Sequence, residues 1–112
     1  MRRTIARLAL LGLAMTSSNA FALNSKSNVV IQGLMSTGDG GALVLLPGGT
    51  DAACGAGGNQ FVISPTAGGL NIDGARTTVA IALSAWTLGK AITIYYDNTV
   101  LGCPVSNIWV NN

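Results

Sequence analysis

The side chains that could carry out chemistry in this 112-residue chain are few, and their types argue against an enzyme. General acid–base catalysis at neutral pH draws mainly on His and on carboxylates with shifted pKa values, but the chain has neither His nor Glu. A Ser nucleophile would therefore lack its base. We expect no catalytic residue and no cofactor. The carboxylates are four scattered aspartates, Asp39, Asp51, Asp73 and Asp97.

Two cysteines, Cys54 and Cys103, are the remaining reactive groups. In an oxidising compartment they can form a disulfide, which would close a loop of about 50 residues and stabilise the fold by about 4 kcal/mol in the chain-entropy model. Free thiols and a two-cysteine metal site are the alternatives, although the metal site would lack further ligands. We predict the disulfide.

Two glycine-rich stretches resemble ligand-binding loops only weakly. The run Gly38-Asp39-Gly40-Gly41 is similar to a phosphate-binding loop, but no Lys follows it and no helix begins after it, so a hairpin turn is favoured. Asp39 and Asp51 could share a calcium ion, but they are too few for its usual six to eight oxygen ligands. We expect no metal site.

The first 22 residues predict export. Arg2, Arg3 and Arg7 precede the apolar run Leu8–Met15, and Ala20-Phe21-Ala22 places small residues where a signal peptidase reads them. We predict a signal peptide over residues 1–22 and a secreted or periplasmic protein. A retained membrane helix is the alternative, but the run is about half the length that a membrane span needs.

Cleavage would leave a single domain over residues 23–112. That part of the chain has three basic and four acidic residues, a net charge of −1. Nucleic acid is excluded as a partner, because phosphate binding needs clustered positive charge.

Hydrophobic periodicity predicts one helix and five strands. The helix is expected over Ala75–Leu88, with Asp73 as its N-terminal cap and Gly89 as its stop. The segment 66–72 is ambiguous between a loop and an edge strand. Strands are expected over 27–35, 42–46, 60–64, 91–96 and 105–110.

This order predicts a mainly β fold. A five-stranded OB-fold-like barrel has one helix between its third and fourth strands, which is the order expected here. An α+β sheet covered by one helix is the alternative.

The predicted helix has two apolar faces, which suggests an assembly. Val79, Leu83 and Trp86 share one face, and the second face consists of Ile81, Ala85 and Leu88. A domain this small has one core, so we predict that the second face is the interface of a homo-oligomer. Low surface charge favours the same conclusion. The alternative is that these residues lie under the 66–72 loop.

Three stretches resemble the binding subunits of subtilase-cytotoxin-type AB5 toxins. Thr87-Leu88-Gly89-Lys90 and Ile92-Thr93-Ile94-Tyr95-Tyr96-Asp97 are similar to that family's helix end and following strand. Ser27-Asn28-Val29-Val30-Ile31 is similar to its first strand. The strong overlap covers roughly 20 residues. The resemblance implies an OB-fold subunit in a ring of five, with helices lining the centre, a sialylated-glycan site and an enzymatic partner subunit.

In the family a first-strand Ser and the second Tyr contact the sugar, and they match Ser27 and Tyr96 here. Asp97 and Asn98 in the adjoining turn could complete the polar set. This chain departs from the family in having Leu23 where an acidic residue precedes the first strand, and in a shorter loop after the fourth strand. Two functions stay open: a glycan-binding ring subunit, or a small exported interaction protein, such as an inhibitor or envelope component, with no sugar site.

Overall fold

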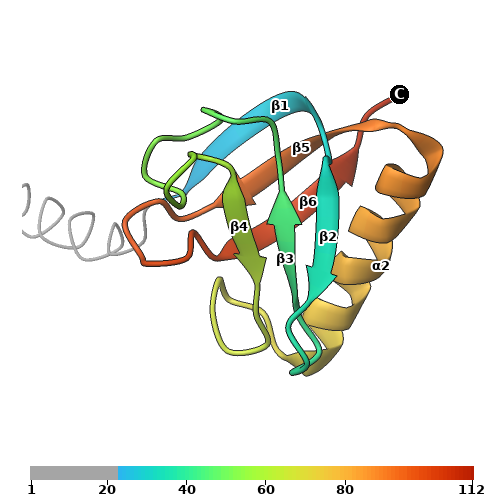
Figure 1. Cartoon of the computed structure of the whole chain (residues 1–112). Coiled ribbons are helices and arrows are strands. Elements are labelled where there is room, and N and C mark those ends of the chain that lie inside the picture. The colour runs from blue at the N-terminus through green and yellow to red at the C-terminus, as the bar shows by residue number, and fades with distance from the viewer. Residues whose placement is uncertain (1–22) are drawn as a thin grey trace, which may run out of the picture.

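The computed structural model describes residues 23–112, so the predicted signal peptide over residues 1–22 lies outside the described part. Within residues 23–112 the elements follow one another as six strands and one helix, as Figure 1 illustrates. They are β1 (Asn24–Val30), β2 (Gly33–Ser36), β3 (Ala42–Leu45), β4 (Gln60–Ile63), α2 (Ile72–Leu88), β5 (Ala91–Tyr96) and β6 (Val105–Val110).

The strands form two antiparallel sheets of three, ordered β1-β5-β6 and β2-β3-β4. The predicted closed five-stranded barrel is therefore wrong. The stretch expected as one strand over 27–35 breaks at Ile31 and Gln32, so its two halves become β1 and β2 in different sheets. In the described chain, one isolated pair, Val62 with Pro104, joins the ladders of the two sheets.

Helix α2 begins earlier than predicted. Asn71, not Asp73, is its N-cap, because the Asn71 side chain accepts a hydrogen bond from the Gly74 N–H at 2.8 Å. Asp73 lies instead in the first turn, and the 66–72 segment is a loop that runs into the helix. The predicted stop at Gly89 is confirmed: its φ of 66° is left-handed, and its N–H donates back to carbonyls of the last turn.

One hydrophobic core lies between the inner faces of the two sheets and the helix. Phe61 of β4 and Tyr96 of β5 meet edge to face across it, with ring centroids 4.8 Å apart. The helix contributes small buried residues, which allow its backbone to approach the sheet closely. These residues are Ala75, Thr78, Ala82 and Ala85.

Candidate functional site

The predicted glycan residue Tyr96 is buried in the core, where a sugar cannot reach its ring. Its hydroxyl donates to Asp51 Oδ2 at 2.5 Å, and the Asn98 amide donates to the same oxygen at 3.1 Å. Asp51 Oδ1 accepts the Ala53 N–H. The hydrogen bond from Tyr96 lowers the pKa of the Asp51 carboxyl, while burial and the bond to Asp51 raise the pKa of Tyr96.

This Tyr96–Asp51–Asn98 network holds the loop that carries Cys54 against the end of β5. The structure contains the predicted Cys54–Cys103 disulfide in the same region, between this loop and the turn before β6. The Asp97 side chain is also engaged within its own turn, because its Oδ1 accepts hydrogen bonds from both the N–H and the hydroxyl of Thr99. Asp51, Asp97 and Asn98 therefore stabilise turns.

Ser27 lies apart from the other three predicted glycan residues. It is exposed and lies in an irregularity of β1 between Lys26 and Val29, where it has no partner in the β1–β5 register. Tyr96 pairs instead with Asn24 at the start of β1. The predicted set of Ser27, Tyr96, Asp97 and Asn98 consequently does not form one surface.

The residue before Tyr96 faces the opposite way, because neighbouring side chains alternate across a strand. Tyr95 packs on the outer side of the β1-β5-β6 sheet against Trp109 of β6, with ring centroids 6.2 Å apart. Trp109 is 58% exposed. Sequence reasoning missed Trp109, although the alternation of β5 had already placed Tyr95 away from the core.

Uncharged polar groups surround these two rings. The Thr93 hydroxyl donates to Asn111 Oδ1 at 3.1 Å, and the Asn111 amide donates to Asn28 Oδ1 at 3.1 Å. Asn107 lies directly opposite Tyr95 in the register. We call this outer surface the aromatic platform. Its members are Asn28, Thr93, Tyr95, Asn107, Trp109 and Asn111.

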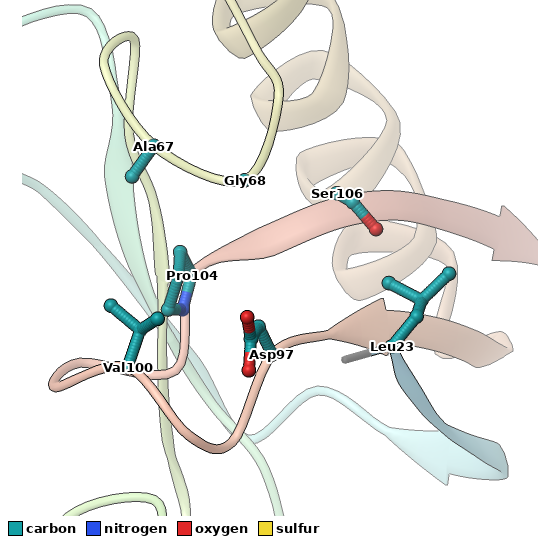
Figure 2. Close-up of a pocket in the computed structure, with 7 residues that line it drawn as sticks. All are labelled: Leu23, Ala67, Gly68, Asp97, Val100, Pro104 and Ser106. Carbon is teal, nitrogen blue, oxygen red and sulfur yellow. The ribbon is translucent and has the colours of Figure 1, made fainter. Parts of the chain in front are cut away.

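A small cavity of about 250 Å³ lies at the start of β6 (Figure 2). Its walls are mainly apolar, and Asp97 and Ser106 are the polar side chains that line it. An apolar group of a few atoms fits such a space, whereas the Asp97 carboxylate would repel an anionic one. The other lining residues are Leu23, Ala67, Gly68, Val100 and Pro104.

The three residues of the predicted oligomer interface on α2 differ in exposure. Ala85 is fully buried in the chain's own core and Ile81 is partly buried against it, so neither is open to a partner as predicted. Leu88, at the end of the helix, is 66% exposed. The small residues of the helix face the core, and Leu83 and Trp86 are exposed on the side of the helix that faces away from it.

The glycine-rich run 38–41 forms the turn between β2 and β3. Asp39 Oδ1 accepts the Gly41 N–H at 3.0 Å and the Thr37 hydroxyl at 2.6 Å, and these bonds lower the pKa of Asp39. The hairpin-turn interpretation is therefore confirmed. Across residues 23–112, no three His, Cys, Asp or Glu side chains gather as metal ligands would.

Comparison of the chain with models of known families, with curated proteins and with solved structures finds no match. The resemblance to the toxin subunits therefore stays an expectation from the sequence. In the described part of the chain, no helix combines the length and the apolar character that crossing a membrane requires.

Proposed function

We propose that this chain is an exported, non-enzymatic carbohydrate-binding subunit that holds sialylated glycans on the aromatic platform. The observation that carries the proposal is the Tyr95–Trp109 pair on the outer face of the β1-β5-β6 sheet, where Trp109 is exposed, Tyr95 is partly exposed and uncharged polar side chains lie beside both rings. Tyr96, the aromatic residue that the resemblance assigns to the sugar, is not part of this proposal because it is buried.

The platform offers the two kinds of contact that a sugar needs. A pyranose ring has apolar C–H faces, which pack on aromatic rings, and hydroxyls, which exchange hydrogen bonds with amides and hydroxyls. Trp109 supplies the exposed ring, and Asn107 and Asn111, on the same strand and just after its end, supply polar groups beside it. Thr93 and Asn111 are held by hydrogen bonds to each other, so this part of the surface is ordered before a ligand arrives.

Binding of this kind is weak for one site, and several copies would compensate. A millimolar site corresponds to only about 4 kcal/mol. Linked copies raise the avidity for a glycan-coated surface by orders of magnitude. The ring of five and the enzymatic partner subunit come from the resemblance alone and extend the proposal.

A glycan array probed with the secreted, disulfide-bonded protein tests the proposal. We expect a signal on sialylated glycans that Trp109→Ala removes. Trp86→Ala is the matched control, because it deletes an exposed tryptophan on α2, away from the platform. Desialylated glycans on the same array test whether sialic acid itself is needed.

Two results would contradict the proposal. The first is no glycan signal from correctly folded wild type, which favours the alternative, an exported interaction protein without a sugar site. The second is equal loss from Trp109→Ala and Trp86→Ala, which would show that the effect is not specific to the platform. The intact mass of the secreted protein checks export, since removal of residues 1–22 leaves a chain that begins at Leu23.

A further inference from the structure

The cavity at the start of β6 brings Leu23, at the beginning of the described chain, beside the carboxylate of Asp97. Leu23 directly precedes Asn24, which pairs with Tyr96 in the antiparallel β1–β5 ladder. One further step along this ladder places Leu23 opposite Asp97, and both residues line the cavity (Figure 2). Residues opposite each other in such a ladder have Cα atoms about 4.5–5.5 Å apart, so the Leu23 nitrogen lies within reach of the Asp97 side chain.

Hydrogen bonds hold Asp97 in place on both sides of β5. Its N–H donates to the Pro104 carbonyl at 3.1 Å, and the N–H of the next residue, Asn98, donates to Asn24 Oδ1 at 3.3 Å. The Asp97 side chain accepts two bonds from Thr99, both at Oδ1. Its other oxygen, Oδ2, accepts no hydrogen bond from any residue of 23–112. One carboxylate oxygen is therefore positioned and open to a further donor.

The surroundings favour a positively charged donor. The cavity walls beside the carboxylate are apolar, contributed by Ala67, Val100 and Pro104. Such walls exclude part of the water that would otherwise screen an ion pair. The other carboxylate bonded to this turn, Asp51, already has its partners: the hydrogen bond from Tyr96 and, to a lesser degree, the charge of Lys26 lower its pKa. Asp97 is thus the carboxylate with an oxygen to spare.

We propose that removal of residues 1–22 completes this site, because it creates the α-ammonium of Leu23 that pairs with Asp97. Hydrolysis of the Ala22–Leu23 peptide bond consumes one water and leaves a carboxylate on Ala22 and an α-amine on Leu23, which is mostly protonated at about pH 7. The ammonium donates to Asp97 Oδ2, and the Leu23 side chain stays at the cavity wall. Before cleavage the same nitrogen is an uncharged amide, so the precursor lacks the ion pair. The inference rests on the export part of the proposed function and not on sugar binding.

The ion pair anchors the end of an edge strand. β1 pairs with β5 alone, and its ladder is interrupted between Lys26 and Val29. The part of β1 before the interruption, 24–26, is held by three residue pairs, so one further contact at its end opposes fraying. Cleavage therefore makes the first strand more stable in the exported protein than in the precursor.

Thermal unfolding of four disulfide-bonded proteins tests the ion pair. They are the mature protein that begins at Leu23, the same protein acetylated at its α-amine, Asp97→Asn, and acetylated Asp97→Asn. Acetylation removes the charge and should lower the Tm of wild type by about 1–5 °C, the range for a partly exposed ion pair in a domain of this size. It should lower the Tm of Asp97→Asn by less than about 1 °C, because two changes that remove the same contact are not additive.

Asp39→Asn is the matched control. Asp39 also lies in a turn, and its Oδ1 likewise accepts a backbone N–H and a hydroxyl, from Gly41 and Thr37. It belongs to the turn between β2 and β3, in the other sheet, so acetylation should lower the Tm of Asp39→Asn as much as that of wild type.

A second measurement reports the charge of the amine and not the stability of the turn. Asp97→Asn keeps a side-chain oxygen that can accept both bonds from Thr99, so it removes the charge alone. Acylation of the Leu23 α-amine at about pH 7, followed by peptide mapping with mass spectrometry, should be about 2–5-fold faster in Asp97→Asn than in wild type. The reason is that the carboxylate favours the protonated, unreactive form of the amine.

Three outcomes would overturn the inference. They are an intact mass of the secreted protein that shows a first residue other than Leu23, an equal effect of acetylation on wild type and Asp97→Asn, and equal acylation rates in these two proteins. A protein that retains residues 1–22 would also contradict the export part of the proposed function, whereas the other two outcomes would leave it standing. Sugar binding is read separately, from Trp109→Ala on the glycan array.

Discussion

Replacing Tyr96 by Phe removes one hydroxyl and leaves the buried ring in place. The lost group is the donor of the 2.5 Å hydrogen bond to Asp51, which keeps its bonds from Asn98 and Ala53. Hydrogen bonds to charged groups contribute about 1.5–3 kcal/mol, and because Asp51 is only partly buried we expect a loss of about 1–2 kcal/mol. For a domain of this size that lowers Tm by about 5–15 °C.

Tyr95→Phe is the matched control, since it makes the same chemical change on the outer face of the same strand. No hydrogen bond from the Tyr95 hydroxyl to another described residue stabilises the fold, so its effect should stay within about 0.5 kcal/mol. Urea unfolding followed by tryptophan fluorescence measures both variants. Equal stability of Tyr96→Phe and wild type at pH 7 would refute the role assigned to the network.

The pH dependence gives a second test of the same bond. The folded state holds the pKa of Asp51 below its ordinary value of 3.8, so the stabilisation is present above the unfolded pKa. It is lost as the pH falls through the folded pKa. The stability difference between wild type and Tyr96→Phe should therefore shrink below about pH 4. At alkaline pH the dependence has the opposite sign. Because folding raises the pKa of Tyr96, its protonated hydroxyl stabilises the folded state below about pH 10, the ordinary pKa of tyrosine, and this stabilisation is lost progressively as the pH rises further.

Three further changes test other parts of the fold. Replacing Cys54 and Cys103 together by Ala should destabilise the domain by about 2–5 kcal/mol, measured by urea unfolding against the oxidised wild type. Ala85→Glu should unfold the chain itself, because it buries a charge in the core, and circular dichroism would show this even at concentrations too low for assembly. Gly68→Ala should lower Tm by several degrees, because Gly68 has φ of 70° and its Cβ would lie 2.4 Å from the Val105 carbonyl oxygen; an unchanged melting curve would contradict this.

Local signals in the sequence predicted several elements because those signals are set by neighbouring residues. The alternation in 91–96 predicted that strand with its observed bounds, the strand expected over 105–110 also has its observed bounds, and Gly89 marked the helix stop. The N-cap was missed because Asn71 and Asp73 are both good caps, and only the bond to Gly74 distinguishes them.

The pairing of strands that are distant in the chain could not be predicted from such local signals. Whether the sheets close into a barrel depends on which strand edges meet, and nothing in the run from Ser27 to Met35 marks the break at Ile31 and Gln32. The helix phase was also misjudged: large apolar residues were expected in contacts, but the closest packing uses alanines. Of the predicted site, Ser27 is exposed on β1, while Tyr96 belongs to the core.

The irregularity in β1 has a consequence for behaviour at high concentration. β1 lies at the edge of its sheet, and free backbone groups along an edge can add a strand from another molecule and begin an aggregate. Here the row of groups is interrupted between Lys26 and Val29, where Asn28 takes φ of 57°. An incoming strand would lose its register at this point and would also meet the charge of Lys26. In a protein with few charges to keep copies apart, the shape of β1 therefore disfavours the addition of a strand at this edge of the sheet.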